Sequence, residues 1–125
     1  MTHEASCLCG AIKVVVTGQL PGPVACHCSQ CRKQSGHFWA SVDLPKERVT
    51  IDGPVSWFQA SEKARRGFCG TCGSFLLWEP IGEDTIAVAM GAFDGATGVE
   101  MVRHIYVADK GDYYRLADGL PQEPQ

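Results

Sequence analysis

Seven cysteines, gathered in three short segments, constrain this chain more than any other feature of its sequence. The segments are Cys7-x-Cys9, the triplet Cys26-x-Cys28-x-x-Cys31, and Cys69-x-x-Cys72. Such close spacings are typical of metal sites, and an odd number of cysteines does not suit a fully disulfide-bonded framework. We therefore expect a fold that brings these distant segments to metal ions.

The cysteines divide most economically into a set of four and a set of three. If the triplet takes one metal ion, Cys7, Cys9, Cys69 and Cys72 remain, which is the composition of a closed, four-thiolate structural zinc site. Other groupings leave an odd thiol or a remainder of two, so this division is preferred. Zinc is the expected metal, and the prediction is two zinc ions per chain.

The triplet is short of one ligand for a tetrahedral ion, and two possibilities stay open. A histidine could complete it, although His27 lies between two ligands and would point away from them in an extended segment. His104 is more simply a packed strand residue. The alternative that we favour is a fourth position kept for water or substrate, as in catalytic zinc sites with three protein ligands.

Three thiolates around a divalent cation favour sulfur chemistry over water activation. The complex carries net negative charge and acidifies water less well than three imidazoles would. It suits a substrate thiol, which it would hold as thiolate facing an electrophile. Gln34, Ser35 and Gly36 follow the triplet and are candidates to line that position, with simple loop closure as the alternative for Gly36. The predicted reaction is the making or breaking of a carbon–sulfur bond.

The rest of the chain predicts a single all-β domain over residues 1–125 with little helix. Strand-like segments rich in β-branched and aromatic residues lie at 11–18, 37–44, 48–53, 55–61, 74–80, 84–93 and 102–109. Asp52-Gly53-Pro54 predicts a hairpin that joins 48–53 to 55–61. One helical turn is expected at 29–35, with Ser29 as its N-cap.

Composition excludes several classes of function. A net charge of −3 does not suit a nucleic-acid binder, and the chain lacks the run of about 18 apolar residues of a membrane-spanning helix. Its first residues do not resemble a secretory signal. We therefore expect a cytoplasmic protein with reduced thiols and no nucleic-acid or membrane partner, and we predict no particular oligomeric state.

Four blocks resemble a known family over nearly the whole chain. CLCGAIKV (7–14), CHCSQCRKQSG (26–36), RRGFCGTCGSFLLWE (65–79) and HIYVADKGDYYRLADGLPQ (104–122) resemble the glutathione-dependent formaldehyde-activating enzymes, a family that also includes centromere protein V. The resemblance implies several coiled antiparallel sheets around two zinc ions. The structural ion would be held at Cys7, Cys9, Cys69 and Cys72, and the catalytic ion at Cys26, Cys28 and Cys31.

The implied activity is that of a carbon–sulfur lyase, which joins glutathione reversibly to formaldehyde as S-hydroxymethylglutathione. Arg32, Lys33, Arg65 and Arg66 are candidates to pair with the carboxylates of glutathione, and for each alone a solvated surface position is the simpler interpretation. Two other functions stay open. One is a non-catalytic zinc-binding scaffold, and the other is a thiol redox or metal-handling protein whose triplet reacts with oxidants.

Overall fold

The computed structural model describes residues 1–125 as ten strands, one α-helix and three short 3₁₀ helices. The strands are β1 (Thr2–Ser6), β2 (Lys13–Thr17), β3 (Val24–Cys26), β4 (Trp39–Pro45), β5 (Val49–Asp52), β6 (Val55–Gln59), β7 (Ala64–Cys69), β8 (Phe75–Pro80), β9 (Thr85–Ala89) and β10 (Arg103–Ile105). The helices are α1 (Ser29–Ser35), η1 (Lys46–Arg48), η2 (Met90–Ala92) and η3 (Val107–Asp109). None of them is long and apolar enough to cross a bilayer. The predicted all-β fold is confirmed.

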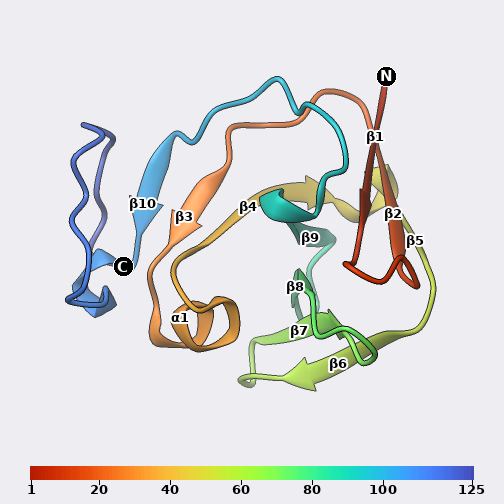
Figure 1. Ribbon diagram of the computed structural model, residues 1–125, viewed down its shortest axis with the longest axis horizontal. Coiled ribbons are helices and arrows are strands. Elements are labelled where there is room, and N and C mark those ends of the chain that lie inside the picture. The colour runs from red at the N-terminus through yellow and green to blue at the C-terminus, as the bar shows by residue number, and fades with distance from the viewer.

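The strands form two sheets (Figure 1). The smaller has the order β1-β2-β5, and the larger has the order β10-β3-β4-β9-β8-β7-β6. Neighbouring strands are antiparallel, as expected, except that β10 runs parallel to β3. A long connection after η2 carries the chain back to this edge, where β10 lies beside β3 and the C-terminal segment lies along the other side of β10 (Figure 1).

The main core is built from alternating side chains of the small sheet and the middle of the large one. In β2, Val14 and Val16 are buried while the flanking Lys13 and Thr17 are exposed, as a period of two requires. Both valines belong to one buried cluster with Val42 of β4 and residues of β8 and β9. Burial of these apolar side chains supplies the main driving force that holds the two sheets together.

The predicted hairpin between 48–53 and 55–61 is wrong. β5 pairs with β2 in the small sheet, whereas β6 pairs with β7 in the large sheet. The turn therefore carries the chain from one sheet to the other. Gly53 has φ +114°, and a Cβ there would lie 2.2 Å from the carbonyl oxygen of Ala11. Only glycine suits that backbone conformation and that close approach. The sequence Asp52-Gly53-Pro54 therefore marks the point where the chain passes from one sheet to the other, and not a hairpin.

Candidate metal centres and the adjoining cavity

The first cluster of thiols fits a tetrahedral zinc ion. The sulfur atoms of Cys7, Cys9, Cys69 and Cys72 all lie within 4.8 Å of one another. Cys9 Sγ is 3.6 Å from Cys7 Sγ and 3.7 Å from Cys69 Sγ. A zinc–sulfur distance of about 2.3 Å places tetrahedral ligands roughly 3.8 Å apart, so these sulfurs need little movement to bind zinc.

Two turns carry these sulfurs, and both direct backbone N–H groups at them. One lies between β1 and β2, where the N–H of Ile12 donates to Cys7 Sγ at 3.2 Å. The other lies between β7 and β8, where the N–H of Cys72 donates to Cys69 Sγ at 3.4 Å and Gly73 has φ +82°. Such donors stabilise thiolates, and the cluster joins a turn of the small sheet to a turn of the large one.

The second cluster consists of three sulfurs at the start of α1. Cys26 ends β3, Cys28 caps the helix, and Cys31 lies in its first turn. Their sulfur atoms lie within 4.8 Å of one another, and no histidine, aspartate or glutamate joins them. The predicted Ser29 cap is wrong, because the Cys28 thiol accepts the N–H of Cys31 at 3.3 Å in place of a hydroxyl. The capping contact and the metal loop therefore use the same sulfur.

Each cluster holds a thiol that loses its proton readily. The hydrogen bond with the Ser74 hydroxyl, at 3.3 Å, lowers the pKa of Cys72 to about 5. In the triplet, hydrogen bonds from the thiols of Cys26 and Cys31 lower the pKa of Cys28 well below its ordinary value, and the pKa of Cys26 is raised by the thiols of Cys28 and Cys31. Deprotonated sulfur is the form that binds metals.

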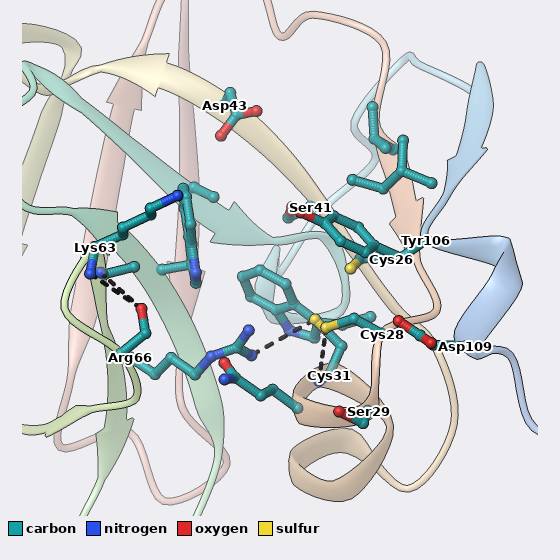
Figure 2. Close-up of a pocket in the computed structure, with 18 of the residues that line it drawn as sticks. Cys26, Cys28, Ser29, Cys31, Ser41, Asp43, Lys63, Arg66, Tyr106 and Asp109 are labelled. Atoms are coloured by element: carbon teal, nitrogen blue, oxygen red, sulfur yellow. Dashed lines mark hydrogen bonds between the residues drawn. The ribbon is translucent and has the colours of Figure 1, made fainter. Parts of the chain in front are cut away.

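The triplet opens into a cavity of about 480 Å³ (Figure 2). Trp39 and Trp78 contribute to its apolar wall, and the Trp39 ring stacks on Phe75 at 4.3 Å between centroids. The charged residues around it come from several strands and connections, and they are Asp43, Lys63, Arg66, Arg103 and Asp109. Apart from the cysteines, the lining carries three cations and two carboxylates, and its basic groups are placed to pair with an anionic group of a ligand.

Of the four basic candidates from the sequence, only Arg66 lines this cavity. It is 4% exposed, and its Nη1 donates to Cys31 Sγ at 3.5 Å and to Gln34 Oε1 at 3.1 Å. Arg65 points to the other face of β7, where it pairs with Glu79 at 2.7 Å and stacks over Trp57. The two arginines therefore have opposite surroundings, although they are adjacent in sequence.

Gln34 and Ser35 form the end of α1 and Gly36 caps it, and none of the three is among the residues that line the cavity. Gln34 reaches it indirectly, through the guanidinium of Arg66. The Ser35 hydroxyl donates to the carbonyl of His37, and Gly36 ends α1 with φ +85° while its N–H donates to the carbonyl of Arg32. A role of these three residues in ligand binding stays a prediction.

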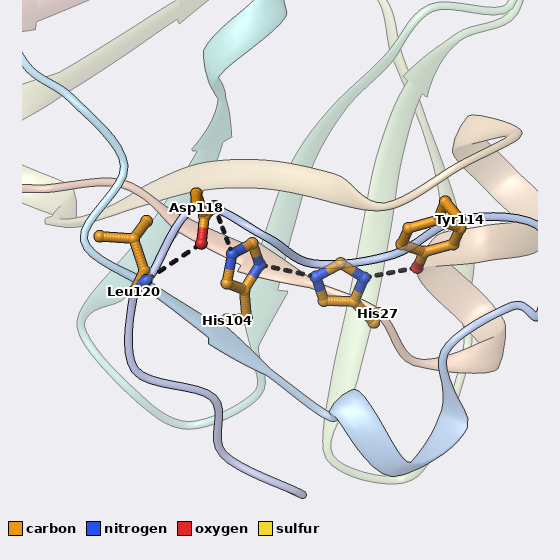
Figure 3. Close-up of polar contacts among 5 residues, drawn as sticks. All are labelled: His27, His104, Tyr114, Asp118 and Leu120. Atoms are coloured by element: carbon orange, nitrogen blue, oxygen red, sulfur yellow. Dashed lines mark hydrogen bonds and ion pairs between the residues drawn. The ribbon is translucent and has the colours of Figure 1, made fainter.

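His27 and His104 do not belong to the sulfur cluster and form a buried hydrogen-bonded series (Figure 3). His27 Nδ1 bonds to the hydroxyl of Tyr114, His27 Nε2 lies 2.9 Å from His104 Nδ1, and His104 Nε2 lies 2.8 Å from Asp118 Oδ2. Burial, together with the neighbouring His104, lowers the pKa of His27 to about 4. His27 is therefore neutral at neutral pH, and both imidazoles are committed to this series.

Comparison with known proteins identifies a family and a fold. The sequence model of the family described as glutathione-dependent formaldehyde-activating enzyme matches residues 2–109, which include all seven cysteines. Among solved structures, the chain is similar to a crystal structure of a Rhodobacter sphaeroides protein, with 20% identity and a TM-score of 0.63. That likeness covers 82% of this chain and all of the other, and it shows a shared fold. No curated protein matches the sequence significantly.

Proposed function

The chain belongs to the family of glutathione-dependent formaldehyde-activating enzymes, and on that premise we propose that it is a zinc-dependent carbon–sulfur lyase. It would join a small thiol such as glutathione reversibly to a small aldehyde such as formaldehyde. The observation that carries this proposal is the triplet of Cys26, Cys28 and Cys31, which faces a cavity without any further protein ligand. Such a site offers one coordination position to a substrate atom.

Two zinc ions with different roles are part of the proposal. Cys7, Cys9, Cys69 and Cys72 would hold a structural ion, since four sulfurs complete its coordination. The triplet would hold the catalytic ion. When bound there, zinc would lower the pKa of a substrate thiol and favour its thiolate, which is the nucleophile in carbon–sulfur bond formation.

The protein residues around the triplet would bind and orient the thiol. A volume of about 480 Å³ is within the range of small-molecule sites. Lys63 and Arg103 would attract the carboxylates of an anionic thiol, and Trp39 and Trp78 would exclude water from the reacting atoms. Gln34 would hold the guanidinium of Arg66 in place, while Ser35 and Gly36 would keep the metal loop closed.

Location and domain organisation complete the proposal. All seven cysteines are free thiols, which the reducing cytoplasm preserves. We propose a cytoplasmic protein that acts as a single domain over residues 1–125.

Exchange spectroscopy tests the activity directly, because thiols and formaldehyde also combine without an enzyme. The two-zinc protein should increase the rate at which glutathione and S-hydroxymethylglutathione interconvert, measured by two-dimensional exchange NMR with ¹³C-formaldehyde. Heat-denatured protein and free zinc at the same concentration are the controls. If the protein accelerates exchange for none of several small thiols and aldehydes, the lyase proposal is wrong.

A further inference from the structure

Arg66 is a buried cation without a carboxylate partner. It is 4% exposed, and no ion pair in the structure includes it. A charged side chain is costly to bury unless it is paired and hydrogen-bonded. The triplet sulfurs, when deprotonated, balance the charge of Arg66, so the feature that packing leaves unexplained is its set of unused hydrogen-bond donors.

Most of the guanidinium donors have no protein acceptor. Only Nη1 donates to protein atoms, namely Cys31 Sγ and Gln34 Oε1, while Nε is buried and unpartnered. Figure 2 shows the guanidinium directed across the cavity toward the sulfurs of the triplet. A guanidinium with free donors at the edge of a cavity is well suited to bind an oxygen anion of a ligand.

Arg65 shows that the fold can pair an arginine with a carboxylate at the adjacent position. Its Nε pairs with Glu79 Oε1 at 2.7 Å, and its guanidinium stacks over Trp57 at 3.9 Å. Both contacts lie outside the cavity. Arg66 also lies over an aromatic ring, that of Phe75 at 5.5 Å, but it has no carboxylate partner and keeps donors without a protein acceptor, and this difference points to a ligand at Arg66.

We propose that Arg66 is a catalytic residue that binds the carbonyl oxygen of the electrophile while the carbon–sulfur bond forms. This inference rests on the proposed lyase function and adds the group that recognises the aldehyde. Arg66 and the three sulfurs line one cavity, and Nη1 lies 3.5 Å from Cys31 Sγ. A small carbonyl compound beside a thiol at the triplet is therefore within reach of the guanidinium.

The step conserves atoms and charge. The thiol releases its proton to solvent, and an electron pair of the sulfur forms the new bond to the carbonyl carbon. The π pair of the carbonyl moves to the oxygen, whose negative charge accepts hydrogen bonds from Arg66, and a proton from solvent completes the hydroxyl group. In the reverse direction the hydroxyl loses its proton, the carbonyl re-forms and the carbon–sulfur bond breaks. Donors aimed at a developing oxyanion typically contribute about 100-fold or more to kcat.

Arg66→Gln, Arg66→Lys and the matched control Arg65→Gln test the role, each with its zinc content measured. We expect Arg66→Gln to keep two zinc ions and to lose about 100-fold or more in kcat. Arg66→Lys should be intermediate, because it keeps the charge without the planar fork of donors. Arg65→Gln should behave as wild type.

Calorimetry supplies a readout that does not depend on turnover. Mercaptoacetate carries an anionic oxygen near its sulfur, whereas 2-mercaptoethanol carries a neutral hydroxyl. The two-zinc protein should bind mercaptoacetate about 10-fold or more tightly than 2-mercaptoethanol. Arg66→Gln should lower that preference to about 2-fold or less, the remainder coming from the more general attraction of Lys63 and Arg103, and Arg65→Gln should retain it in full. A wild-type protein without the preference would overturn the proposal even if every variant failed to fold.

The remaining outcomes separate this inference from the lyase proposal. If Arg66→Gln and Arg66→Lys both retain only one zinc ion, Arg66 serves metal retention and the inference is overturned. Turnover that is unchanged in both variants also overturns it, while the lyase function stands. An Arg66-dependent preference for mercaptoacetate without any thiol–aldehyde turnover would support the anion-binding role of Arg66 and overturn the lyase function.

Discussion

His27, which lies between two cysteines of the triplet, is hydrogen-bonded through its Nε2 to Nδ1 of His104 at 2.9 Å, across a separation of 77 residues. His104 lies in β10, which runs parallel to β3 and pairs Ile105 with Cys26. The strand that carries the first sulfur is therefore held by both a backbone ladder and a buried side-chain contact. With His27 neutral and Asp118 ionised, a consistent arrangement has Tyr114 donating to His27, His27 to His104, and His104 to Asp118.

Replacement of His104 by leucine should destabilise the protein and loosen the triplet. The change leaves the buried Nε2 of His27 without a partner, at a cost of about 1–3 kcal/mol in unfolding free energy. Urea denaturation of the zinc-loaded protein measures that cost. A chelator should also remove zinc faster from the triplet than in wild type, while removal from the four-thiol cluster is unchanged. His3→Leu is the control outside the series, and equal effects of the two changes would contradict this account.

Gly53 is expected to tolerate no side chain. The residue has φ +114°, and the Ala11 carbonyl oxygen lies 2.2 Å from the point that a Cβ would occupy, so Gly53→Ala should lower the unfolding free energy by about 2 kcal/mol or more. Gly95 has an open surrounding and no positive φ, so Gly95→Ala is the matched control. Denaturation midpoints compare the two. Equal stability of both variants would show that the passage between the sheets is not tightly constrained at Gly53.

The two cysteine clusters should respond differently to the loss of one thiol. Cys72→Ser opens a closed site that joins the two sheets, so we expect loss of one zinc ion and a large loss of stability, on the order of several kcal/mol. Cys28→Ser should leave the fold and one zinc ion in place while activity is lost. Zinc analysis, thermal denaturation and the exchange assay distinguish them. A Cys28→Ser protein that unfolds as readily as Cys72→Ser would contradict the division of roles.

The cysteine clusters could be predicted from the sequence because ligand chemistry restricts spacing. Three sulfurs within six positions can reach one ion from a single tight loop, and the remaining four complete a second site. Strands in which buried β-branched side chains alternate with more exposed ones, such as β2, can also be predicted from the sequence. β7 cannot be, because Arg65 and Arg66 interrupt its apolar pattern, and its formation depends on pairing with β6 and β8.

The cavity also could not be predicted from the sequence, and the reason is different. Lys63 and Arg103 belong to no motif. They line the same cavity only because the connection before β7 and strand β10 both border it. The partner of His27 likewise depends on the parallel pairing of β10 with β3, for which the sequence has no local signal. Arg66 and Arg65 look alike in sequence, and only their alternation on β7 separates a buried cation from a paired surface one.

X-ray absorption at the zinc edge tests the central claim most directly. The spectrum of Cys28→Ser gives the contribution of the four-thiol cluster, which is subtracted from the wild-type spectrum to leave that of the ion at the triplet. The account predicts that the ion at Cys26, Cys28 and Cys31 has three sulfur ligands and one light atom, and that glutathione converts it to four sulfurs. The spectrum of Cys28→Ser itself should not change with glutathione. A fourth ligand that is a protein imidazole, unchanged by glutathione, would contradict the claim that the triplet keeps a position for a substrate thiol.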